Sequence, residues 1–103
     1  MKTQYNIVKY ENKEMVDLLL GRKGGKTTMR IIDQLLYRPH SITQLSKTLK
    51  LDYKTIQYHI ELILNIELVE HNDKKYGTLY YPTKKLINNL KEYEQIKKYL
   101  IEW

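Results

Sequence analysis

The sequence predicts a small, mainly α-helical domain that carries one β-hairpin in its C-terminal half. Apolar residues recur at helical spacing along several segments, and two short runs of strand-forming residues flank one turn-rich stretch. The chain of 103 residues also has the length of a single domain. We divide it into an N-terminal arm with a short helix (1–26), a central unit (27–83) and a C-terminal helix (84–103).

Two helices are expected in the first part of the chain. Asn12 can cap a short helix over residues 13–20, after which a glycine-rich stretch breaks the chain. A second helix, capped by Thr27 or its neighbour, is expected to run to about Tyr37. Pro39 then ends it, because a proline disfavours the α conformation of the residue before it.

Two further helices follow, with a tight turn between them. Thr43 precedes a helix of two turns that ends at Leu49, and Asp52 is placed to cap a longer helix from Tyr53 to about Ile66. One side of the longer helix is apolar, whereas the opposite side is polar, aromatic and partly basic. We therefore expect the polar side to face outward.

A hairpin and a last helix complete the expected order. Residues 68–71 and 78–81 are predicted to be partner strands, because the residues between them favour a turn. Thr83 can cap a final helix that runs to Trp103. The apolar residues of this helix repeat at steps of three and four, which places them in one stripe.

The net charge of +6 favours an anionic partner. The basic excess is greatest over residues 26–60, where six basic side chains accompany two acidic ones. The loop before the second helix offers Arg22, Lys23 and Lys26, which can touch backbone phosphate. Residues 26–60 are therefore the first candidate for a face that binds nucleic acid.

The order of helix, short helix, tight turn, helix and hairpin is that of a winged helix-turn-helix. Residues 41–60 (SITQLSKTLKLDYKTIQYHI), followed by Leu68-Val69-Glu70 and Tyr76-Gly77, resemble the ArsR-like group of prokaryotic transcriptional regulators, particularly its small archaeal members. The resemblance covers roughly residues 27–83. It implies a DNA-binding regulator that dimerises through its terminal helices.

The helix after the tight turn is the expected DNA-reading element, since a helix fits the major groove, where base edges present distinct patterns. We expect Gln57 to pair with adenine and Lys54 to reach guanine or a phosphate. Tyr53 and Tyr58 are expected to lie at the DNA surface. The remaining expected DNA-binding residues are Lys47, Thr55 and His59 as backbone contacts, Thr43 and Gln44 on the shorter helix, and Lys74, Lys75 and Tyr76 at the hairpin tip.

The stripe of the last helix has two interpretations. It can pack on its own domain, or it can pair with a second copy of the chain together with the short N-terminal helix. We favour the second, because so short a domain leaves little core for a further 20 helical residues. The expected dimer interface consists of Val16, Leu19, Leu20, Leu90, Tyr93, Ile96, Leu100 and Trp103.

Enzymatic and metal chemistry find little support. The chain has no cysteine, and His40, His59 and His71 fall on three different elements, so we expect surface histidines and no metal site. The Gly-Lys-Thr at 25–27 lacks the glycine five positions earlier that a phosphate-binding loop requires. No nucleophile and base stand together either. We expect neither catalysis nor a cofactor.

The main expectation is a sequence-specific regulator that binds double-stranded DNA as a homodimeric repressor. No apolar run approaches the ~18 residues that span a bilayer and no signal-peptide core is present, so we expect a cytoplasmic protein without a membrane partner. One alternative is a winged-helix protein-interaction module within transcription or replication machinery, which would favour an acidic or apolar outward face. Another is a protein that binds structured RNA.

Overall fold

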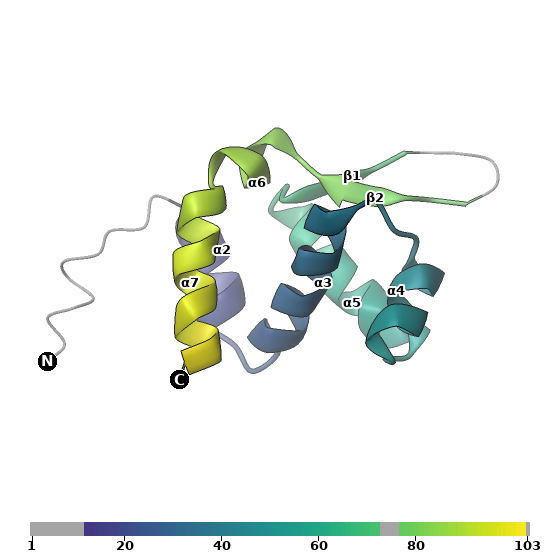
Figure 1. Ribbon diagram of the computed structural model, residues 1–103, viewed down its shortest axis with the longest axis horizontal. Helices are drawn as coiled ribbons and strands as arrows, with labels where there is room; N and C mark the ends of the chain where they lie inside the picture. Colours follow the sequence, from purple (N-terminus) through teal and green to yellow (C-terminus); the bar gives the residue numbers. More distant parts are fainter. Residues whose placement is uncertain (1–11, 73–76, 103) are drawn as a thin grey trace, which may run out of the picture.

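Six helices and one two-stranded hairpin make up residues 12–72 and 77–102, which are the residues that this computed structural model describes (Figure 1). The fold class is therefore as predicted. In chain order, the elements are α2 (Lys13–Leu20), α3 (Gly25–Tyr37), α4 (Ile42–Leu49), α5 (Tyr53–Asn65), β1 (Val69–His71), β2 (Tyr80–Pro82), α6 (Lys84–Asn88) and α7 (Leu90–Glu102).

Three of the predicted helix caps are confirmed. The side chains of Asn12, Asp52 and Thr83 each accept a hydrogen bond from the backbone N–H three residues later, at 3.1, 3.0 and 3.3 Å. Each bond satisfies one of the N–H groups that a helix start leaves without a partner. Local sequence therefore determines where α2, α5 and α6 begin.

The expected start of α3 is wrong, because its N-cap is Gly24, which lies three residues before Thr27. The glycines explain the early start. A Cβ on Gly25 would lie 1.9 Å from the carbonyl oxygen of Leu19, so only glycine lets α3 begin so close under the end of α2. Gly24 has no side chain to make a capping bond, so this helix start depends on tertiary packing.

The start of α4 also differs from the prediction. Ser41 is the cap, and its hydroxyl accepts a hydrogen bond from the Gln44 backbone N–H at 3.1 Å. Gln44 returns the interaction, since its Oε1 accepts from the Ser41 backbone N–H at 2.9 Å. This reciprocal pair is a capping box, and it moves the helix start to Ile42, ahead of Thr43.

The expected single C-terminal helix is divided into α6 and α7 at Asn89. The Asn89 side-chain amide donates to the Lys85 carbonyl at 2.8 Å, and its own backbone N–H donates to the same oxygen at 3.2 Å. An asparagine side chain that competes for backbone partners in this way interrupts a helix. The apolar stripe continues across the interruption into α7.

The hairpin pairs β1 with β2 in antiparallel register, with Val69 opposite Pro82 and His71 opposite Tyr80. Each strand is shorter than predicted. The segment between α3 and α4 adds one bridge at the outer edge of β2, because His40 and Tyr80 exchange backbone hydrogen bonds of 3.2 and 2.8 Å. This bridge fixes the hairpin to the segment that joins α3 to α4.

The last helix packs on its own protomer, and this contradicts most of the expected dimer seam. Figure 1 shows α7 beside α2, and α3 lies between this pair and the α4–α5 pair. Leu19, Tyr93 and Ile96 are 0% exposed and Leu100 is 8% exposed, so these four belong to the protomer's core. Val16, Leu20 and Leu90 are half-buried against that core, and Trp103 lies outside the described residues.

A buried polar cluster fixes α7 on α3. The Tyr93 hydroxyl lies 2.7 Å from Asp33 Oδ1, to which it donates, and 3.2 Å from the Met29 carbonyl oxygen. Lys97 pairs with the other carboxylate oxygen of Asp33 at 3.0 Å. Burial, together with the hydrogen bond to Asp33, raises the pKa of Tyr93 far above its ordinary value, so the hydroxyl stays protonated as a donor.

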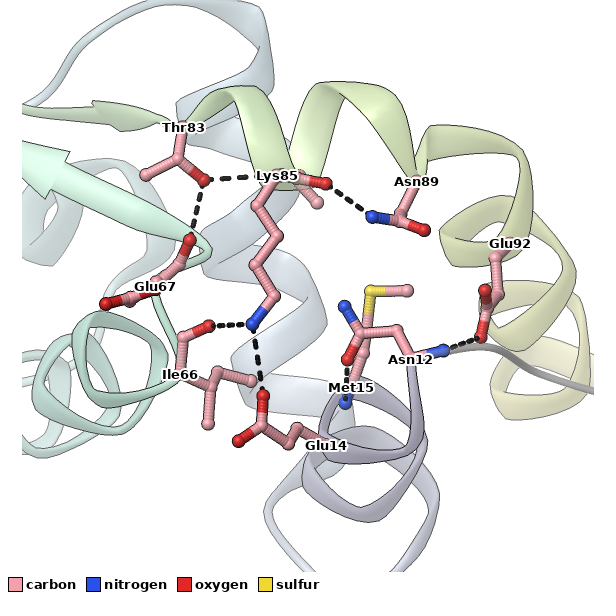
Figure 2. A network of polar contacts seen from close by, with 10 residues as sticks. Asn12, Glu14, Met15, Ile66, Glu67, Thr83, Lys85, Asn89 and Glu92 are labelled. Atoms are coloured by element: carbon pink, nitrogen blue, oxygen red, sulfur yellow. Dashed lines mark hydrogen bonds and ion pairs between the residues drawn. The ribbon is translucent and has the colours of Figure 1, made fainter.

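Further polar contacts fix α2 against α6 and α7 (Figure 2). The Lys85 ammonium donates to the Ile66 carbonyl at 2.8 Å and pairs with Glu14 at 3.0 Å. The backbone N–H of Asn12 donates to a carboxylate oxygen of Glu92 at 3.1 Å. These contacts connect the start of α2 to the end of α5 and to both C-terminal helices.

The Tyr93 hydroxyl allows a direct test of this packing. Tyr93→Phe should lower the free energy of unfolding by about 1–3 kcal/mol, because Asp33 loses a buried donor. Tyr37→Phe is the control, since Tyr37 is 79% exposed and its change should stay within about 0.5 kcal/mol. Urea denaturation of the two variants measures both values. Equal losses in the two variants would contradict the role of the cluster.

Candidate nucleic-acid interface

The turn between α4 and α5 is held by backbone and side-chain bonds. Lys50 adopts a left-handed conformation with φ of 59°, and the Leu51 N–H donates to the Ser46 carbonyl at 3.2 Å. The Ser46 hydroxyl in turn donates to the Leu51 carbonyl. Arg30 of α3 reaches the Leu49 carbonyl at 3.3 Å, which places a cation at the negative end of α4. These bonds fix the turn that joins the two helices.

The two faces of α5 separate as predicted. Ile56, Ile60 and Ile63 are almost completely buried against the core, at 0, 1 and 0% exposure. The opposite face is solvent-exposed, and both of its aromatic residues are open to water, with Tyr53 at 50% and Tyr58 at 55%. The other exposed residues of this outward face are Lys54, Gln57 and Glu61.

Asp52 stabilises the start of α5. Hydrogen bonds from the Thr55 side chain and backbone lower the pKa of the Asp52 carboxyl below its ordinary value. A carboxylate that stays ionised at a helix N-terminus also interacts favourably with the helix dipole. The first turn of α5, which carries Tyr53 and Lys54, is thereby held in place.

His59 lies inside the protein, and the expectation that it is a surface residue touching a phosphate is wrong. It is 5% exposed, and its Nδ1 lies 2.7 Å from the Thr28 hydroxyl of α3. Arg22 donates to the same hydroxyl at 3.1 Å and to the Leu18 carbonyl at 3.1 Å. Burial lowers the pKa of His59, and the nearby Arg22 charge lowers it further.

The other two histidines divide between surface and interior. His40 is 1% exposed, so its expected surface position is also wrong, and its Nδ1 lies 2.7 Å from the Arg38 carbonyl oxygen. Its backbone bridge to β2 explains the burial, because the hairpin covers this segment. His71 is exposed on β1, as expected.

The loop between α2 and α3 reaches the outward face of α5 through Arg22. The guanidinium carbon lies 6.0 Å from the centroid of the Tyr58 ring, and this ring meets the His59 ring edge to face at 5.3 Å. Gly24 makes the approach possible, since a Cβ there would lie 2.7 Å from Arg22 and 3.0 Å from His59. We call Arg22, Gly24, Thr28 and His59 the junction cluster.

The other residues expected to contact DNA differ in exposure and in whether the structure describes them. Thr43, Gln44 and Lys47 are exposed on α4, although the Gln44 side-chain oxygen is engaged in the capping box. Thr55 is half-buried on α5. Lys74, Lys75 and Tyr76 lie outside the described residues. Thr28 and Arg30 carry structural roles at this face that the sequence did not single out.

Residues 12–72 and 77–102 contain no group of three His, Asp or Glu side chains arranged to hold a metal ion. None of the helices within these ranges is long and apolar enough to cross a membrane.

Comparison with solved structures identifies the architecture. No protein-family model matches the sequence, and no curated protein matches it. An ArsR-like transcriptional regulator from Rhodococcus sp. RHA1 superposes with a TM-score of 0.62 at 20% identity, covering 86% of this chain and 77% of that one. The chain has the winged helix-turn-helix fold. In this fold, α4 and α5 form the helix-turn-helix, and the β1–β2 hairpin is the wing.

Two further solved structures also match the chain. Reduced HlyU from Vibrio cholerae N16961 matches with a TM-score of 0.59 at 18% identity, covering 79% of this chain and 81% of that one. An ArsR family transcriptional regulator matches with a TM-score of 0.53 at 11% identity, covering 93% of this chain and 97% of that one. The matches extend beyond the central unit, so the similarity includes terminal helices. The narrower likeness to archaeal members stays a prediction.

The buried histidine predicts a pH dependence of stability. As the pH falls below the ordinary histidine value of about 6.5, the unfolded chain gains a proton at His59 before the folded chain does. The stability due to the neutral ring is therefore full above that pH and is lost below it. The free energy of unfolding, measured from about pH 8 to about pH 5, should fall with acid more steeply in the wild type than in His59→Gln.

Removal of an exposed histidine is the control for this comparison. His71→Gln, on β1, should retain the acid dependence of the wild type. An acid dependence of the same steepness in His59→Gln and the wild type would show that the His59 ring does not carry the effect.

Proposed function

We propose that the chain is a transcriptional regulator that binds double-stranded DNA in a sequence-specific manner. The observation that carries this proposal is the outward face of α5, where exposed polar and aromatic side chains occupy the second helix of a helix-turn-helix. The net charge of +6 supports a polyanionic partner. The winged-helix structures similar to this one include proteins described as transcriptional regulators, which also supports the proposal.

In this proposal, α5 is the recognition helix and enters the major groove. The Gln57 amide is suited to pair with adenine, and Lys54 to reach a guanine edge or a phosphate. Tyr53 and Tyr58 present an apolar ring and a hydroxyl at the same surface. Contacts that position the protein on the DNA backbone come from Thr43 and Lys47 on α4 and from Thr55 on α5. Lys74, Lys75 and Tyr76, which lie between β1 and β2 in the sequence, are proposed as further backbone contacts.

We further propose that the regulator acts as a homodimer and represses by occupying its site. The α2–α7 pair lies on the side of α3 away from α4 and α5, so a second copy docked there leaves both recognition helices free (Figure 1). Val16 and Leu90 are half-buried on this pair, and Ile101 is 61% exposed. A twofold dimer reads two half-sites about one helical turn apart, roughly 34 Å.

Selection of bound DNA from a random duplex pool tests the proposal and supplies a preferred sequence. Gln57→Ala should then lower affinity for that sequence by about 1–3 kcal/mol while leaving random DNA almost unaffected. Lys47→Ala should weaken both DNAs alike and reduce the salt dependence by about one unit in slope. Titrations at several salt concentrations separate the two effects. Identical behaviour of the variants would show that α5 is misassigned.

The same assay tests the alternative partners. An enriched inverted repeat would support the dimeric regulator. Tighter binding to duplex RNA than to duplex DNA, or no enrichment from the pool, would contradict the proposal.

The dimer is tested separately by sedimentation. Ile101→Glu places a charge on the exposed edge of α7 and should shift the chain from dimer to monomer at micromolar concentration. Tyr37→Glu is the matched control, because Tyr37 is also exposed but lies at the end of α3. A wild-type chain that is already monomeric under these conditions would contradict the proposed assembly.

A further inference from the structure

A pocket of about 380 Å³ lies between α2, the loop that follows it, the first turn of α3 and α7. Its volume falls within the range of small-molecule sites, roughly 300–1,000 Å³. The residues come from segments far apart in the sequence that α2 and α7 bring together. The pocket is lined by Leu19, Leu20, Arg22, Lys23, Lys26, Tyr99 and Leu100.

The pocket combines an apolar wall with a cationic one. The apolar wall consists of Leu19 and Leu100, which belong to the core, and of the half-buried Leu20. Arg22, Lys23 and Lys26 supply three positive charges, and none of the lining residues is acidic. Within the described residues, Lys23 and Lys26 form no ion pair that would neutralise them.

Arg22 has donor groups to offer a ligand here. Both hydrogen bonds that it donates within the described part of the chain come from Nη1. A guanidinium carries five N–H donors in a planar fork that suits a carboxylate. The other guanidinium N–H groups form no hydrogen bond within the described part of the chain, and Arg22 lines the pocket.

We propose that this pocket binds an amphipathic organic anion, in which a carboxylate is attached to an apolar chain or ring. A small inorganic anion would leave the leucine wall unused, and a neutral hydrocarbon would leave three cations without a counter-charge. In a carboxylate with an apolar chain, the chain packs on the leucine wall and the carboxylate pairs with the cationic wall.

Occupancy of the pocket acts on α5 through the junction cluster. Arg22 donates to the Thr28 hydroxyl, which contacts His59 of α5, and its guanidinium lies near the Tyr58 ring. A carboxylate that draws the guanidinium into the pocket removes this support from α5. This step rests on the proposed DNA-binding function, and it lowers DNA affinity when the pocket is filled.

Calorimetric titration of the full chain with sodium octanoate tests the site without DNA. Octanoate should bind at one site at least about tenfold more tightly than 1-octanol, acetate or inorganic phosphate. A Lys23→Ala, Lys26→Ala double variant should lose about tenfold in octanoate affinity. A Lys84→Ala, Lys91→Ala variant removes the same charge from exposed positions outside the pocket and should bind as the wild type does.

Each other outcome overturns the site. Phosphate binding as tight as octanoate binding would indicate a simple anion site. 1-Octanol binding as tight as octanoate binding would indicate a purely apolar pocket. Absence of octanoate binding, or an unchanged affinity in the Lys23→Ala, Lys26→Ala variant, would refute the proposal directly.

Titration of the preferred duplex, with octanoate or an equal concentration of acetate, tests the coupling. A fall in DNA affinity of about threefold or more with octanoate alone supports it. Octanoate binding without any change in DNA affinity overturns the proposed coupling, whereas the proposed binding site still stands. Failure to bind any duplex would contradict the proposed function, whereas the calorimetric result would stand.

Discussion

The hydrogen bond between His59 and Thr28 is the constraint on which the arrangement of the candidate interface depends. It joins α5 to α3 at 2.7 Å inside the protein, among the isoleucines that hold the inner face of α5. Apolar packing alone is non-directional and tolerates some rotation of a helix, whereas a buried hydrogen bond is directional and does not. The rotation of α5 decides which side chains face outward. The outward position of Gln57 and Tyr58 therefore follows from a bond on the opposite side of the helix.

Much of this fold was predictable because its signals are local. Asn12, Asp52 and Thr83 cap bonds that lie three residues away, and the stripe of α5 lies within one helix. His59 was predictable in part, since it falls three residues after Ile56 and four before Ile63, on the buried side. Its partner was not, because Thr28 lies 31 positions earlier. A helical pattern shows which face is buried but not what covers it.

The same limit explains the error at α7. The stripe of α7 was identified correctly, yet Tyr93 finds its partner in Asp33, 60 positions away on the same chain. Lys50 was missed for a different reason, because a left-handed residue is usually signalled by glycine, and here a lysine occupies a turn that Ser46 and Leu51 hold locally. Gly24 and Gly25 were misinterpreted in the sequence. They suggested a flexible break, whereas their lack of a Cβ serves close contacts to Arg22 and Leu19. Tertiary contacts, which no local pattern specifies, decided the packing of α7 and the positions of Gly24 and Gly25.

Arg22 lies where the two sides of the molecule meet. It lines the pocket beside α2 and α7, donates to Thr28 within the junction cluster and lies near the Tyr58 ring on α5. A signal from pocket to α5 therefore needs no long path through the core. A ligand can shift an equilibrium only by its differential affinity for the two states, and a tenfold change requires roughly 1.4 kcal/mol. One hydrogen bond to a charged group contributes about 1.5–3 kcal/mol. The loss or gain of a single guanidinium contact is thus sufficient to couple the pocket to the exposed face of α5.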